Sequence, residues 1–147
     1  MIQRKQSIFI GISIMFSFFL FLLPSVNYSV GNEIVRLSLN PLSDLGKSTN
    51  WVYLLFVFNL LFFATSFSAL FMFKNRKKQI KICGYSIISS ILLLIGFLTF
   101  PLNQSHEIVK QFNWPISLIP ISIILLLIAI RFIKQDEELV RSADRIR

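Results

Sequence analysis

The chain has 147 residues, of which 54% are hydrophobic and only 15% are charged, whereas soluble domains are about 45–50% apolar and about 25% charged. Together with a mean hydropathy of +0.69, this composition excludes a soluble globular domain. The net charge of +8 comes from Lys and Arg at the ends of apolar segments, which is typical of membrane topology signals and not of nucleic-acid binding. A single cysteine excludes an intramolecular disulfide or a thiolate metal cluster.

Four apolar stretches are long enough to cross a hydrocarbon layer about 30 Å thick. In chain order they are Ser7–Val26, Trp51–Phe73, Ile82–Phe100 and Trp114–Ile133. No ionisable group lies near the middle of any of them. The sequence therefore predicts an all-α membrane protein: a single domain of four transmembrane helices arranged as two hairpins, followed by a charged helical tail over residues 134–147.

Basic residues predict the orientation of these spans. Twelve of the fifteen Lys and Arg residues fall at the N-terminus, between the second and third spans, or from the last turn of the fourth span (Arg131) onward. Because cytoplasmic segments carry the excess of positive charge, both termini are expected in the cytoplasm and the protein in the inner membrane. The residues assigned to lipid contact and topology are the basic Lys74, Arg76, Lys77 and Lys78, with Trp51 and Trp114 in the aromatic belt of the outer interface.

The largest outer loop runs from Asn27 to Asn50 and contains the segment "IVRLSLN". Its apolar residues Val35, Leu37 and Leu39 alternate with polar ones, and a period of two indicates an extended segment. We expect a short strand here that lies on the membrane surface or caps the helices.

Polar residues inside the predicted spans allow two interpretations. The set consists of Asn59 in the second span and Ser86, Ser89 and Ser90 in the third. Small-xxx-small spacing of the serines favours close helix packing, and we expect Asn59 to hydrogen-bond a serine of the third span. Alternatively, these residues line a polar path.

Residues that could carry catalysis are scarce. His106 is the only histidine and precedes Glu107, but a metallohydrolase helix requires a second histidine where Lys110 stands. Cys83 has no histidine near it in sequence, so its default role is that of a small apolar residue. The sequence therefore predicts no catalytic residues, no cofactor and no metal site, and the spans lack the buried charges of ion-coupled pumps.

The tail "DEELVRSADRIR" has the pattern of an amphipathic helix. Arg141 lies four residues after Glu137 and three before Asp144, spacings that place these side chains on one helix surface. Leu139, Val140, Ala143 and Ile146 form a narrow apolar stripe. Such a helix either lies on the lipid headgroups or docks a partner, and Arg141, Asp144 and Arg145 are the predicted docking residues.

The two ends, "MIQRKQSIF" and "KQDEELVRSADRIR", resemble those of small bacterial membrane proteins catalogued as domain of unknown function 4293. The resemblance extends over the whole chain in the spacing of the spans. The tail carries the more specific match, although Ile146 stands where leucine is expected. The resemblance implies an inner-membrane protein with four spans, and it brings no activity or catalytic residues.

Three hypotheses about function follow. The leading one is a non-enzymatic accessory or scaffold subunit that contacts membrane lipids and docks a cytoplasmic protein partner through its tail. The alternative is a small oligomeric transporter or channel with a polar path near Asn59 and the serines of the third span, which leaves homo-oligomerisation open. The third is a membrane enzyme that acts at His106 and Glu107.

Overall fold

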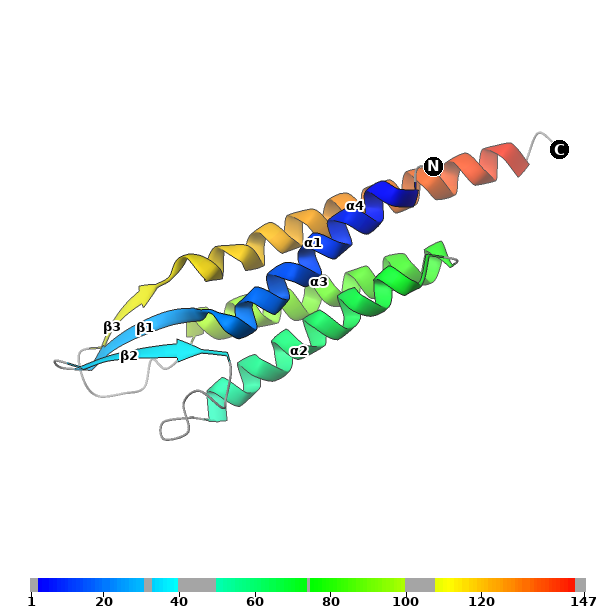
Figure 1. Cartoon of the computed structure of the whole chain (residues 1–147). Coiled ribbons are helices and arrows are strands. Elements are labelled where there is room, and N and C mark those ends of the chain that lie inside the picture. The colour runs from blue at the N-terminus through cyan, green and yellow to red at the C-terminus, as the bar shows by residue number, and fades with distance from the viewer. Residues whose placement is uncertain (1–2, 31–32, 40–49, 74, 100–107, 145–147) are drawn as a thin grey trace.

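The computed structural model describes residues 3–30, 33–39, 50–73, 75–99 and 108–144, which form four helices and a small sheet (Figure 1). The elements are α1 (Gln3–Leu22), β1 (Pro24–Val30), β2 (Glu33–Ser38), α2 (Asn50–Phe71), α3 (Arg76–Thr99), β3 (Ile108–Phe112), the 3₁₀ helix η1 (Trp114–Ser117) and α4 (Leu118–Asp144). The predicted set of four helices is confirmed. The segments Trp51–Phe71, Arg76–Thr99 and Trp114–Val140 are long and apolar enough to cross a membrane.

The first helix is shorter than predicted. The span was expected to reach Val26, but α1 ends at Leu22, and Pro24 begins strand β1. The last helical hydrogen bond runs from the Leu23 N–H to the Phe19 carbonyl, at 3.0 Å. Proline has no N–H to donate and disfavours helical geometry at the residue before it, so the helix stops here. The apolar helical stretch of α1 is Gln6–Leu22.

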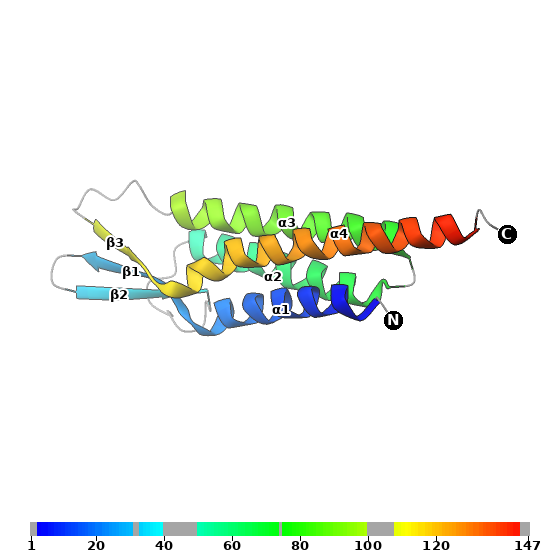
Figure 2. The same ribbon diagram turned by 90° about the horizontal axis from the view of Figure 1, so that it is seen from above.

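Each helix packs against two others (Figure 2): α1 contacts α2 and α4, and α3 also contacts α2 and α4. We call these four helices the helical body. A tight turn joins α2 to α3, in which the Asn75 N–H donates to the Met72 carbonyl at 3.1 Å. The Asn75 side chain then accepts from the Lys78 N–H at 3.3 Å, which caps the start of α3.

The buried positions of every helix alternate in steps of three and four residues. They are Gln6, Ile10, Ser13, Ser17 and Leu20 in α1; Val52, Leu55, Asn59, Phe62, Ser66 and Ala69 in α2; Gln79, Cys83, Ser86, Ser90, Leu93 and Phe97 in α3; and Ile119, Ser122, Leu126, Ala129, Ile133 and Asp136 in α4. This is the seam of a left-handed helical assembly. Ser89 and Gly96 of α3 are buried beside the seam.

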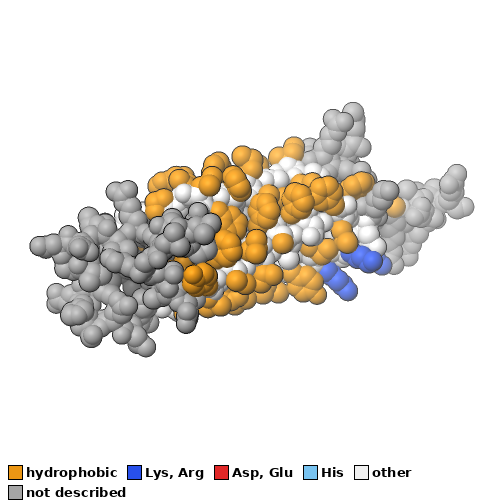
Figure 3. Space-filling view, turned by 60° about the horizontal axis from the view of Figure 1, so that its bottom comes forward, with side chains coloured by type: hydrophobic (Ala, Val, Ile, Leu, Met, Phe, Trp, Pro, Cys, Tyr) orange, Lys and Arg blue, Asp and Glu red, His pale blue; other side chains and the backbone are white. Residues whose placement is uncertain are grey.

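The outer surface of the helical body is more apolar than its interior. Large hydrophobic side chains are exposed on all four helices, among them Met15, Leu61, Ile88 and Ile124. In the space-filling view they cover the middle of the molecule, and Lys and Arg side chains appear at one end (Figure 3). Soluble monomers rarely expose apolar patches of more than a few hundred Å². We call this surface the apolar belt.

A three-stranded antiparallel sheet in the order β2-β1-β3 extends from the opposite end of the helical body (Figure 1). Val26 of β1 is the register partner of Leu37 in β2 and of Phe112 in β3. The strand expected in the first outer loop is confirmed by β2. Strands β1 and β3 were not predicted. In β1, apolar Val26, Tyr28 and Val30 alternate with polar residues, but its first residues were assigned to the first span. In β3, Ile108 and Val109 are adjacent apolar residues, so the period of two is not clear.

Candidate functional site

A layer of small polar side chains crosses the interior of the helical body. Every helix contributes to it, and its buried residues are Ser13 and Ser17 of α1, Asn59 of α2, Ser86, Ser89 and Ser90 of α3, and Ser122 of α4. Apolar clusters lie on both sides along the helix axes: one includes Leu20, Leu55, Leu93 and Ile119, and the other includes Ile10, Phe62, Cys83 and Leu126. The layer therefore marks the centre of the packed interior.

Asn59 forms its hydrogen bonds with α1. Its Nδ2 donates to the Ser17 carbonyl at 3.2 Å, and the Ser17 hydroxyl donates to Asn59 Oδ1 at 3.0 Å. The predicted partner, a serine of the third span, is therefore wrong. Ser17 occupies a position of α1 that faces α2, and hydrophobicity alone does not predict which neighbour of α2, α1 or α3, supplies the partner of Asn59. These bonds tie α1 to α2.

The hydroxyl groups of the α3 serines donate hydrogen bonds to acceptors in α3 itself or in the adjacent helix α2. Ser86 donates to Thr65 Oγ1 of α2 at 2.9 Å. Ser89 donates to the Tyr85 carbonyl at 2.9 Å, and Ser90 donates to the Ile87 carbonyl at 2.8 Å, both within α3. Asn59 is thus bonded across the α1–α2 interface and Ser86 across the α2–α3 interface. Their hydrogen bonds do not join them into one polar site.

A second polar group ties three helices together at the end opposite the sheet. Asp136 of α4 is 4% exposed, and its Oδ2 accepts a hydrogen bond from Gln6 Nε2 of α1, which is also 4% exposed. The Arg76 guanidinium of α3 donates to the Asp136 carbonyl oxygen at 2.6 Å. We call Gln6, Arg76 and Asp136 the clasp. Close by in sequence, Phe9 and Phe132 stack with ring centroids 5.7 Å apart.

Sequence reasoning missed two of the three clasp residues and gave Arg76 a role in topology. A usable signal existed, because Gln6 and Asp136 continue the three-and-four spacing of the buried positions in their helices. Oε1 of Gln6 is buried and has no partner among the described residues. The clasp is therefore a buried polar cluster with some hydrogen-bonding capacity left over.

Beyond the clasp, α4 continues alone. Its last turns extend past the start of α1 and past the turn between α2 and α3 (Figures 1 and 2). Leu139 and Val140 are 56% and 48% exposed there, beside exposed Glu138 and Ser142. We call residues 137–144 the projecting segment. It is helical throughout, as the absence of Gly and Pro led us to expect.

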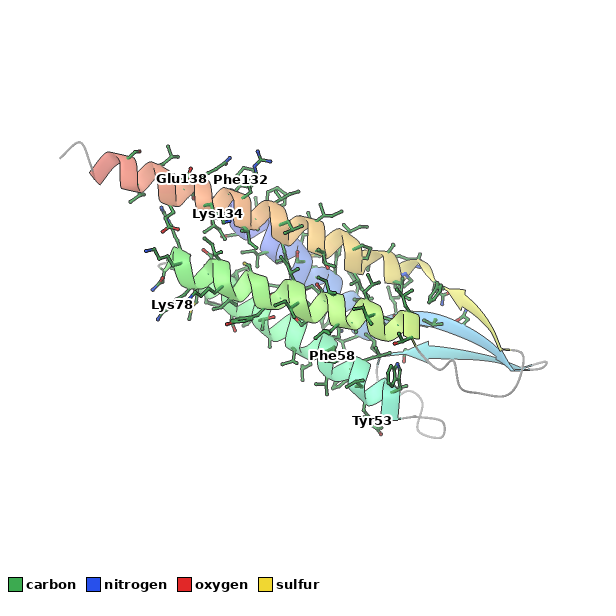
Figure 4. All side chains as sticks on the ribbon, turned by 180° about the vertical axis from the view of Figure 1, so that it is seen from behind. Tyr53, Phe58, Lys78, Phe132, Lys134 and Glu138 are labelled. Carbon is green, nitrogen blue, oxygen red and sulfur yellow. The ribbon has the colours of Figure 1, made fainter. Side chains whose placement is uncertain are left out.

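The structure describes some of the predicted site residues, and others lie outside its described part. Lys77 and Lys78 are exposed, and Lys78 lies at the same end as Lys134 and Glu138 (Figure 4). Trp114 is 66% exposed, and Trp51 donates its Nε1–H to the Gly96 carbonyl at 3.1 Å. Arg141 and Asp144 belong to α4, but their side chains lie outside the described part of the structure. Lys74, His106, Glu107 and Arg145 lie outside the described residues entirely.

An apolar exterior around the middle of the molecule and three helices long enough to cross a bilayer are consistent with a helical membrane protein. Residues 2–146 match a protein family described as "Domain of unknown function (DUF4293)". The chain therefore belongs to this family, and the resemblance seen at its two ends is confirmed. No curated protein matches the chain.

Proposed function

We propose that the chain is a non-enzymatic subunit of the bacterial inner membrane that docks a protein partner through the projecting segment of α4. One observation carries the proposal: Leu139 and Val140 are large, adjacent and about half exposed on a helix that has left the helical body. Burying a side chain of this size contributes about 1.5–3 kcal/mol. Covering both would supply part of the free energy of a complex, and further contacts would have to offset an association cost of about 4–15 kcal/mol.

The charges of the projecting segment favour a protein partner over burial in hydrocarbon. Glu137 and Glu138 precede the two apolar residues, and exposed Ser142 follows them. Carboxylates are costly inside a bilayer, and anionic lipid repels them. A partner helix or groove can cover Leu139 and Val140 while these carboxylates stay in water.

The proposed orientation places the projecting segment in the cytoplasm. Exposed Lys77, Lys78 and Lys81 of α3 lie at the clasp end of the helical body, and Lys134 of α4 is exposed at the same end. Cytoplasmic ends of membrane helices carry the excess of Lys and Arg. In this arrangement all four helices form a bundle that spans the membrane, with both termini inside and the sheet outside.

A pull-down from nanodiscs tests the docking proposal. The tag belongs at the N-terminus, so that α4 ends freely. We expect a defined protein to copurify with the wild type, and to be lost from the Leu139→Ser/Val140→Ser variant and from the Arg141→Glu/Arg145→Glu variant. Glu138→Ser is the matched control, because it changes an exposed residue of the same segment without removing apolar surface. Identical partner-free particles from all samples would refute the proposal.

A further inference from the structure

A hollow of about 240 Å³ lies at the sheet end of the molecule, where α1 passes into β1 and where β3 passes into η1 (Figure 1). It is open on one side. Its lining consists of Leu23, Pro24, Asn27, Asn113, Trp114 and Pro115. The hollow thus lies between the end of α1 and the 3₁₀ helix η1 that leads into α4. It shares no residue with the clasp or the projecting segment.

Two asparagines form a rigid polar wall. Asn27 Nδ2 donates to Asn113 Oδ1 at 3.1 Å, and Asn113 Nδ2 donates to Asn27 Oδ1 at 3.1 Å. Asn113 Nδ2 also donates to the Pro24 carbonyl at 3.2 Å. Both N–H groups of the Asn113 amide are therefore used, whereas one N–H of the Asn27 amide has no partner among the described residues. That N–H is a donor held in place beside the hollow.

The rest of the lining is apolar and uncharged. Leu23, Pro24, Pro115 and the ring of Trp114 supply it. Trp114 is 66% exposed, and the neighbouring Leu22 at the end of α1 is 62% exposed. In an orientation with α1 and α4 across a bilayer, these two side chains and the hollow would lie near the boundary between hydrocarbon and water, the depth that tryptophan prefers.

We propose that this hollow binds the glycerol ester region of a phospholipid from the leaflet at the sheet end. An ester carbonyl is an acceptor and suits the spare N–H of Asn27. The acyl chain would continue over Leu23 and Leu22 onto the apolar belt. Because no charged side chain of the described residues lines the hollow, we expect recognition to rest on the ester and the acyl chain and to be independent of the headgroup charge. This site is independent of the proposed partner docking.

Tryptophan fluorescence can test the site, because the chain has only two tryptophans. The full chain in detergent is titrated with phosphatidylcholine brominated near the ester end of one acyl chain. In the Trp51→Phe variant, Trp114 alone reports on the hollow. In the matched Trp114→Phe variant, Trp51 reports from the α2–α3 side, where its Nε1–H is bonded to Gly96. We expect saturable quenching of Trp114 and weak, non-saturating quenching of Trp51.

Two further titrations test which part of the phospholipid the hollow recognises. Brominated phosphatidylglycerol should quench Trp114 along the same curve as phosphatidylcholine. Replacing Asn27 by Leu in the Trp51→Phe background should weaken the apparent affinity about fivefold, the loss expected for one hydrogen bond. Non-saturating quenching of Trp114 in the Trp51→Phe variant would overturn the site itself. This outcome does not depend on the Asn27→Leu variant, which tests the hydrogen bond alone. A clear preference for phosphatidylglycerol would overturn the assignment to the ester region.

Discussion

Asn59 is a polar side chain inside the helical body, and two roles come into question for it: a hydrogen bond between helices, or part of a polar path for a solute. Its amide exchanges two hydrogen bonds with Ser17, and both residues are fully buried. Hydrogen bonds between membrane helices contribute about 0.6 kcal/mol each on average. The geometry therefore favours a role in joining α1 to α2 over a role in guiding a solute.

Replacing Asn59 by Leu should lower the free energy of unfolding by about 1 kcal/mol, because two interhelical bonds are lost while the branched shape of the side chain is kept. Phe62→Ala, one turn away in the same helix, is the control and should cost about 3–5 kcal/mol through the cavity it leaves. Unfolding in mixed micelles measures both. If Asn59→Leu leaves the protein folded but abolishes its function in cells, the solute-path alternative takes the lead.

Gly96 illustrates a residue required by close packing. A Cβ at this position would lie 2.5 Å from Cδ2 of Leu55, which is fully buried in the apolar cluster nearer the sheet. Gly84, one helix face away, has nothing within 4 Å of such a Cβ. Both glycines lie in α3, so they share the same gain in helix propensity on replacement by alanine.

We therefore expect Gly96→Ala to be less stable than Gly84→Ala by about 1–3 kcal/mol, the usual cost of forcing extra volume into a packed core. The comparison cancels the propensity term of about 1 kcal/mol. Thermal unfolding in one detergent gives the difference directly. Equal stabilities would mean that Leu55 can move aside without loss and that α2 and α3 are less tightly packed here than the structure indicates.

At the scale of elements, α4 combines two environments in one uninterrupted helix. Its first part packs inside the helical body, the clasp holds it at Asp136, and the projecting segment follows directly. Asp136 is tied both through its side chain to α1 and through its carbonyl to α3. The clasp thus fixes the point at which α4 leaves its neighbours.

The clasp makes a prediction about paired substitutions. Asp136→Leu or Gln6→Leu alone should destabilise the chain by about 1–3 kcal/mol, because each leaves a buried polar partner unsatisfied. The double variant should recover most of that loss, since both polar groups are then gone. Glu138→Ala, an exposed change two residues further along, should have little effect. Additive single effects in a double-mutant cycle would show that Gln6 and Asp136 are not coupled.

Sequence reasoning located the helices well because long apolar runs are a strong signal. It failed at the end of α1, where Leu23–Val26 is apolar enough to continue a span but Pro24 turns the chain into β1. It also missed β1 and β3, whose pairing joins residues far apart in the chain. The partner of Asn59 and the burial of Asp136 depend on which helices are neighbours, and hydrophobicity alone does not encode that.

The surface of the whole molecule is apolar where that of a soluble protein is polar. Interior positions combine Leu, Ile and Phe with Ser, Asn, Gln and Asp, while large apolar side chains also face outward. Small interior residues allow the helix backbones to approach one another, as in membrane helix assemblies. The polar residues are the useful signal in the sequence, because pairs seven residues apart, such as Gln6 and Ser13 or Asn59 and Ser66, mark the buried face of an otherwise apolar helix.

Orientation of the whole molecule can be tested by cysteine accessibility. In a Cys83→Ala background, Ser142→Cys in the projecting segment and Phe112→Cys at the end of β3 are both exposed positions. We expect a membrane-impermeant thiol reagent applied to spheroplasts to label Phe112→Cys at once and Ser142→Cys only after permeabilisation. The reverse pattern would invert the proposed topology and place the projecting segment outside the cell.

The length of α4 limits where a partner can reach the projecting segment. A helix rises about 1.5 Å per residue, so Leu139 lies about 8 Å beyond Lys134 along α4 if the helix stands upright. Lipid headgroups occupy about 5–8 Å on each side of the hydrocarbon. If Lys134 marks the edge of the hydrocarbon, Leu139 and Val140 lie about 8–9 Å beyond it, at the outer limit of the headgroup layer. A protein that covers them in this arrangement would touch the headgroups, so membrane-bound proteins are the first candidates for the proposed partner.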